Sequence, residues 1–143
     1  MSTGVQMWGV TPPISLSGPT EKDLEITQAL EEELRANNVF ESSEEAKLRE
    51  VVLGRVDALV KEFVYRASIQ HGLSENAARA SGGKIFTFGS YRLGVHGPGS
   101  DIDTLCVAPK HVQREDFFEI FEALLMERDD VTEVAAGPGA DVP

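Results

Sequence analysis

Four residues in one stretch of this chain have the types and spacing needed for chemistry on a phosphate. Gly89 and Ser90 follow a predicted strand, and Asp101 and Asp103 come after ten intervening residues. A glycine lets the backbone turn tightly, so the amides and the hydroxyl that follow it can face an anion. Two carboxylates offer the hard oxygen ligands that Mg²⁺ prefers, and phosphate and water complete its shell. The stretch predicts a nucleotide and metal site.

Each half of this pattern has an ordinary structural interpretation when it stands alone. A Gly-Ser pair after a strand is most often a simple turn, and an isolated Asp-x-Asp is most often a solvated acidic turn. Side chains two residues apart on a strand share a face, with Cα atoms about 6.6 Å apart. The two halves are predicted to lie on neighbouring strands at one sheet edge, and the combination therefore favours one shared site.

The residues around the motif resemble a known family. The run Phe-Thr-Phe-Gly-Ser-Tyr-Arg-Leu-Gly-Val-His-Gly-Pro-Gly-Ser-Asp-Ile-Asp spans residues 86–103. Its G-S-x10-D-x-D pattern resembles the signature of the polymerase-β-like nucleotidyltransferases. With its flanks it is similar to the eukaryotic nuclear poly(A) polymerases. The similarity extends from the Trp-Gly-Val-Thr-Pro-Pro arm to about Val142 and is most specific over residues 84–112.

This resemblance implies an activity and a set of site residues. The family adds AMP from ATP to RNA 3′ ends with two Mg²⁺ (or Mn²⁺) ions, in the nucleus. By the family pattern, Asp101 and Asp103 are the catalytic residues and metal ligands. The nucleotide-binding residues would be Phe88, Gly89, Ser90, Asp101, Ile102 and Asp103. The implied partners are ATP, an RNA 3′ end and cleavage and polyadenylation factors, and we expect a monomer.

The same resemblance predicts that the chain is truncated before the third catalytic strand. The family uses a third carboxylate on a strand that would lie beyond Pro143, and Asp141 in the turn-like tail does not match it. The family's middle and RNA-binding domains would also be missing. Two alternatives to an active enzyme therefore remain: a non-catalytic fragment that binds nucleotide or a partner, and a chain without stable function because its sheet ends in an unpaired edge.

The elements before the motif are predicted to be helices. Residues 1–19 are rich in Pro, Gly, Ser and Thr and predict an extended arm. Thr20 is expected to cap a helix that ends near Ala36. Ser42 and Glu45 have the spacing of a capping box, and the helix that follows runs to about His71-Gly72. Its apolar stripe contains Leu48, Val51, Val52, Val56, Leu59, Val60 and Phe63.

The elements around the motif predict an α/β (α+β) fold with leading helices. Strands are expected over 84–88 and 102–107, and an amphipathic helix over 115–126. Residues 131–134 suggest the start of a third strand. We expect residues 20–143 to be the N-terminal part of a nucleotidyltransferase catalytic domain with a mixed sheet. In that part, helices occupy residues 20–80 and a βαβ-like core occupies residues 84–134.

Composition limits the function classes. The chain of 143 residues has a formal net charge of −11, which argues against binding nucleic acid through a broad basic surface. No apolar stretch approaches the roughly 18 residues of a membrane span. Cys106 is the sole cysteine and is expected to be a small buried side chain. A single cysteine also favours a reducing compartment. Arg92 is equally suited to a phosphate or a salt bridge, and His96 is expected to hydrogen bond within the loop.

Overall fold

The computed structural model describes residues 11 and 13–137. Contacts divide the chain into two units, Met1–Phe40 and Glu41–Pro143. Most of the arm predicted over residues 1–19 lies outside the described residues, and its described part, residue 11 and residues 13–19, forms neither helix nor strand. Asp141 and the end of the tail also lie outside them. Along the described part of the chain, none of the helices is both long enough and apolar enough to cross a bilayer.

The first unit contains one helix, α1, over Glu21–Ala36. It begins as predicted, because the Asp23 amide donates to the Thr20 hydroxyl (3.3 Å) and the Asp23 carboxylate accepts from the Thr20 amide (2.8 Å). None of its residues is buried. Its support is local and includes an ion pair between Arg35 and Glu31 at 2.5 Å. Pairs of this kind four residues apart contribute only about 0.3–0.5 kcal/mol each.

The second unit is built on the long helix α2, Ser43–Gln70, which begins at the predicted capping box of Ser42 and Glu45. Only part of the predicted apolar stripe is covered. The buried core cluster takes its α2 members from the second half of the helix, namely Val60, Phe63, Val64 and Ala67. Leu48 and Val51, in the first half, are 61% and 50% exposed. The strands and the later helical segments pack onto α2 from Val56 onward. The apolar stripe therefore begins earlier along α2 than the part of the helix that these elements cover.

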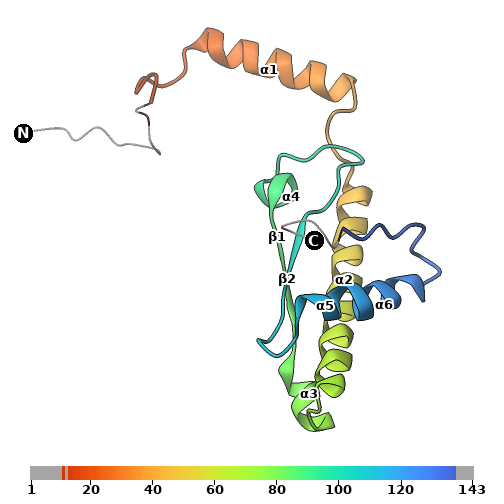
Figure 1. The fold of residues 1–143 in the computed structure, drawn as a ribbon. Helices are drawn as coiled ribbons and strands as arrows, with labels where there is room; N and C mark the ends of the chain where they lie inside the picture. Colours follow the sequence, from red (N-terminus) through yellow and green to blue (C-terminus); the bar gives the residue numbers. More distant parts are fainter. Residues whose placement is uncertain (1–10, 12, 138–143) are drawn as a thin grey trace, which may run out of the picture. The chain divides into compact units, whose positions relative to one another are not determined.

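Two short strands follow α2 and the short helix α3 (Glu75–Ser81), whose capping residue is Ser74. Strand β1, Lys84–Thr87, pairs with β2, Thr104–Val107, and the register sets Thr87 opposite Thr104. Figure 1 shows this pair of strands running beside α2. The mixed α+β fold class is thereby confirmed.

The two strands predicted around the motif form, but they pair antiparallel and not in the parallel manner of a βαβ unit. The connecting helix α4, Gly89–Leu93, has five residues. It rises only about 7.5 Å, which is too short to return the chain along a parallel strand. Residues 131–134 are not a strand. The Val131 amide instead donates to the Arg128 carbonyl at 3.4 Å, closing a turn.

The predicted helix over 115–126 forms as three consecutive segments: α5 (Arg114–Asp116), a π-helical turn η1 (Phe117–Phe121) and α6 (Glu122–Met126). Phe117 and Phe121 stack with ring centroids 4.9 Å apart, and both meet the buried ring of Phe63 edge-on at 5.9 and 5.7 Å. This aromatic cluster belongs to the core, as its helical spacing predicted.

Two histidines tie the end of α2 to the segment that precedes η1. Asp116 is buried and accepts from His71 Nε2 at 2.8 Å and from the Gln113 amide at 2.7 Å. Burial alone would raise the pKa of Asp116, but these two hydrogen bonds together with the nearby His71 and His111 lower it. His111 pairs with the buried Ser68 hydroxyl at 2.7 Å. These polar contacts fix the C-terminal half of α2 against the chain that leaves β2.

The Phe63→Ala substitution is expected to destabilise the fold by about 3–5 kcal/mol, because it removes a fully buried ring and leaves a cavity between two other rings. Urea unfolding followed by circular dichroism measures this loss. The matched control is Phe86→Ala, since Phe86 lies on β1 with 53% of its surface exposed. Equal losses in the two variants would contradict a core centred on Phe63.

Candidate metal and nucleotide site

The structure brings the two halves of the motif together at Gly89 and Asp103. Gly89 begins α4 with a positive φ of 61°, and a Cβ atom there would lie 2.1 Å from Oδ2 and 3.1 Å from Cγ of Asp103. The Asp103 carboxylate therefore rests directly against the Cα of Gly89. The sequence predicted the turn at this glycine, but it gave no signal that the absent side chain also makes room for a carboxylate fourteen residues later.

Backbone pairing holds these halves in place. The Phe88 amide donates to the Asp103 carbonyl at 3.1 Å, which continues the β1–β2 ladder one residue beyond the strands. Asp103 thus lies one residue before β2 and not within it, because the strand begins at Thr104 and not at Ile102 as the sequence predicted. Asp103 is half-buried and Asp101 is exposed. Both aspartates therefore precede β2 at the sheet edge where β1 ends.

The first turn of α4 adds hydrogen-bond donors at the same edge. Phe88 caps α4 without a side-chain hydrogen bond, and Gly89, Ser90 and Tyr91 form the first turn. Amides in the first turn of a helix have no acceptor within the helix. The Ser90 hydroxyl is a further donor, and its side chain is half-buried. This turn has the chemistry to hold an anion beside Asp103.

The donor set fits a hard divalent cation that retains other ligands. Within the described residues, no group of three or more His, Cys, Asp or Glu side chains is placed to hold a metal ion. Two carboxylates are nevertheless a usual protein contribution to a Mg²⁺ site that is completed by water and substrate phosphate. Asp101 and Asp103 could therefore hold such an ion only together with a ligand.

A cavity of about 610 Å³ opens beside Asp103. Phe88 and Ile102 line it together with Asp103, and its deeper wall is apolar, formed in part by Phe63 and Cys106. Burial raises the pKa of the Cys106 thiol, in keeping with a small apolar side chain. Three of the six predicted nucleotide-binding residues thus share one cavity of ligand-binding size. Gly89, Ser90 and Asp101 do not line it.

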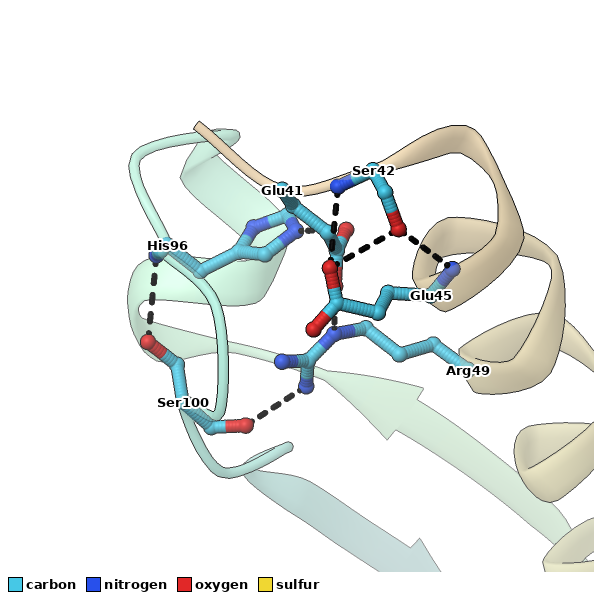
Figure 2. Close-up of polar contacts among 7 residues, drawn as sticks. Glu41, Ser42, Glu45, Arg49, His96 and Ser100 are labelled. Carbon is cyan, nitrogen blue, oxygen red and sulfur yellow. Dashed lines mark hydrogen bonds and ion pairs between the residues drawn. The ribbon is translucent and has the colours of Figure 1, made fainter. Parts of the chain in front are cut away.

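The glycine-rich loop between α4 and Asp101 is tied to the start of α2 through Glu41 and Arg49, two residues that the sequence did not single out. Glu41 accepts from Arg49 Nε and, at 3.0 Å, from His96 Nε2. Arg49 also donates through Nη1 to the Ser100 carbonyl at 2.6 Å, as Figure 2 shows. The hydrogen bond from Arg49 lowers the pKa of Glu41, against the opposing effect of burial.

These contacts account for His96 but not for Arg92. Since a carboxylate accepts, His96 donates through Nε2. The ring therefore has a hydrogen-bonding role, but its partner is Glu41 beside α2 and not a group within the loop. Arg92 is exposed and lines a second cavity of about 300 Å³ beside Glu41 and Glu50. Among the described acidic side chains none lies within salt-bridge distance of Arg92. The salt bridge considered for it is thus not formed there.

Comparison with known proteins identifies relatives over nearly the whole chain. A family model of the poly(A) polymerase nucleotidyltransferase domain matches residues 9–143. A poly(A) polymerase of Candida albicans (PAPa) is 54% identical over 138 residues, and poly(A) polymerase pla1 of Schizosaccharomyces pombe is 50% identical over 138 residues; each alignment covers 96% of this chain. Nuclear poly(A) polymerase 1 of Arabidopsis thaliana is 50% identical over 139 residues, also 96% of this chain. The alignments cover 25%, 24% and 20% of these relatives, so the chain spans a quarter of their length or less.

Proposed function

Because this chain belongs to the poly(A) polymerase nucleotidyltransferase family, as its sequence predicted, we propose that it supplies the ATP-phosphate cradle and two metal-binding carboxylates of a polynucleotide adenylyltransferase. The reaction would transfer AMP from ATP to an RNA 3′ end and release pyrophosphate. The observation that carries the proposal is the direct contact between Gly89 and the Asp103 carboxylate. It makes one site of two motifs that are individually weak.

Each part of the site has a role in this proposal. Asp101 and Asp103 would hold Mg²⁺ or Mn²⁺, which when bound supplies a Lewis acid that acidifies the attacking 3′-hydroxyl and offsets charge on the pyrophosphate. The Ser90 hydroxyl and the first-turn amides of α4 would donate to the triphosphate. Phe88 and Ile102 would contact the nucleotide from the cavity beside Asp103. The protein's contribution is mainly to position the reactants and to balance their charge.

The proposed partners follow from the family and not from surface charge. Residues 51–110 contain seven basic and five acidic side chains, whereas the flanking segments are acidic. An RNA 3′ end would therefore be held near the site by a few contacts and by the bound cation, since a broad basic surface is lacking in the sequence. We further propose a nuclear location, in line with the name of the nuclear Arabidopsis relative, and association with cleavage and polyadenylation factors.

Calorimetric titration of the chain with ATP in the presence of Mg²⁺ tests this proposal. We expect saturable binding that needs the cation, because the two carboxylates and the phosphates share it. Titration with ATP and EDTA is the control, and it should show no comparable heat. Absence of cation-dependent heat would contradict the proposed site.

A second candidate function is that of a non-catalytic partner-binding piece of such an enzyme. The observation in its favour is the exposed apolar face on the first half of α2, where Leu48, Val51 and Val52 are uncovered within their unit. Primer extension with ATP, an RNA primer and Mg²⁺ separates the candidates. Tailing by the 143-residue chain that is lost in Asp101→Ala would establish catalysis. Absence of heat in the titration with ATP and Mg²⁺, combined with capture of a partner in a pull-down, would favour the second candidate.

A further inference from the structure

The loop that leads into Asp101 is anchored at a distance, on the N-terminal end of α2. Arg49 Nη1 donates to the carbonyl of Ser100 at 2.6 Å, across 51 positions of sequence. The loop is also held at His96, whose Nε2 donates to Glu41 at 3.0 Å across 55 positions. Glu41 contacts both Arg49 and His96 and so connects the two attachments. We call Glu41, Arg49 and His96 the loop anchor (Figure 2).

The loop anchor is shielded from water, unlike the ion pairs within the exposed surface of α2. The side chains of Arg49, Glu41 and His96 are 11%, 9% and 15% exposed. By contrast, Arg66 and Glu62, also paired on α2, are 43% and 45% exposed. An exposed pair contributes little, whereas removal of one partner from a shielded pair leaves a charge that must find new partners. The anchor is therefore expected to hold one geometry.

The base of the anchor is itself rigid. Glu41 directly precedes Ser42, the capping residue of α2, whose amide and hydroxyl are both bonded to Glu45 at 3.0 and 2.9 Å. Within the described residues the second ring nitrogen of His96 is buried and has no hydrogen-bond partner. The contact with Glu41 is thus the polar contact that orients this ring. A capped helix end is a firmer support for a loop than another loop would be.

We propose that Arg49 is a positioning residue for the Asp101 and Asp103 carboxylates. Arg49 acts through the carbonyl of Ser100, which is part of the peptide bond between Ser100 and Asp101. Its positive charge is already paired with the carboxylate of Glu41. Its low exposure leaves it little surface with which to contact nucleotide directly. The part of this inference that concerns metal rests on the proposed function. The part that concerns the geometry of the loop does not.

Two measurements on the chain test the inference with three variants. Arg49→Met removes every hydrogen bond of the guanidinium. Arg49→Lys keeps the positive charge but offers only one donor nitrogen. Arg66→Met is the matched control, since Arg66 belongs to the exposed ion pair on the same helix. Hydrogen exchange reads the amides of residues 99–103 and, as an internal reference, those of residues 60–67 in the core. Titration of Mn²⁺ in the presence of ATP, followed by electron paramagnetic resonance, reads the carboxylate pair.

Arg49→Met is expected to speed exchange at residues 99–103 at least about tenfold while residues 60–67 keep their protection, since only the local opening changes. The apparent Mn²⁺ dissociation constant should rise about 10–100-fold, as for loss of a group that supports metal ligands. Arg49→Lys should recover part of both effects, and Arg66→Met should show neither. A residue that merely stabilised the fold would speed exchange in both segments alike.

Each outcome decides the inference. Unchanged exchange at residues 99–103 in Arg49→Met overturns it, as does an unchanged Mn²⁺ constant when the parent chain binds Mn²⁺ with ATP. If Arg49→Met does not fold, the same criteria apply to Arg49→Lys. If the parent chain binds no Mn²⁺ with ATP, the proposed function fails, and the exchange data alone decide whether Arg49 positions the loop.

Discussion

The Asp103→Asn substitution is expected to lower the affinity of the chain for Mn²⁺ with ATP by at least about 100-fold. The change is nearly isosteric, so the side chain can keep its place against Gly89, but it removes one of the two carboxylate charges that would hold the proposed cation. A cation's electrostatic contribution at such a site is worth several kcal/mol, and each 1.36 kcal/mol is a factor of ten. The titration of Mn²⁺ in the presence of ATP, followed by electron paramagnetic resonance as described above, measures the loss.

Asp57→Asn is the matched control for this substitution. Asp57 pairs with Lys61 at 2.6 Å on the surface of α2, where loss of the ion pair should cost only a few tenths of a kcal/mol. Both variants should unfold near the urea midpoint of the parent chain, because neither aspartate belongs to the core cluster. If Asp103→Asn binds Mn²⁺ with ATP as tightly as the parent does, Asp103 is not a metal ligand.

The Gly89→Ala substitution is expected to disrupt the site by a different route, without removing any charged group. Its Cβ would lie 2.1 Å from Oδ2 of Asp103, so either the carboxylate or the turn must move. The positive φ of 61° adds a backbone cost of about 1–2 kcal/mol for a residue with a side chain. We expect affinity for Mn²⁺ with ATP to fall about 10–100-fold through misplacement of one ligand.

Gly94→Ala separates the steric effect from the backbone effect. Gly94 has a similar φ of 69°, yet a Cβ there would meet nothing within 4 Å. In urea, Gly94→Ala should therefore show only the backbone cost and Gly89→Ala at least as large a loss of stability, while the affinity for Mn²⁺ with ATP should fall far more in Gly89→Ala. Equal losses of affinity would mean that the contact with Asp103 does not matter for binding.

The features that could be predicted from the sequence are those that depend on near neighbours in the chain. Thr20 and Ser42 begin helices because a carboxylate three residues later completes each cap. The aromatic cluster could be assigned to the core because Phe117 and Phe121 share one helix face. The spacing of Gly89 and Asp103 indicated one site because a turn and a strand start are local patterns. Each of these signals lies within a few residues of the feature it predicts.

The features that could not be predicted depend on contacts between distant segments. The periodic pattern identifies Leu48 and Val51 as part of the apolar face of α2. It does not indicate which half of that helix packs against other elements. The antiparallel pairing follows from the path of the chain through α4, which strand propensity does not encode. Arg49 appears in the sequence as an ordinary helical charge. Its bond to Ser100 exists only because β1 and the loop fold back onto α2.

The contact between Gly89 and Asp103 also has a consequence for how this sequence can change over time. The space that a side chain at position 89 would need is the space that the carboxylate at position 103 fills. The two positions are therefore not free to vary one at a time, although fourteen positions of sequence separate them. A substitution at either position alters which residues the other can tolerate, so a single mutation at position 89 would persist only with a second change at position 103.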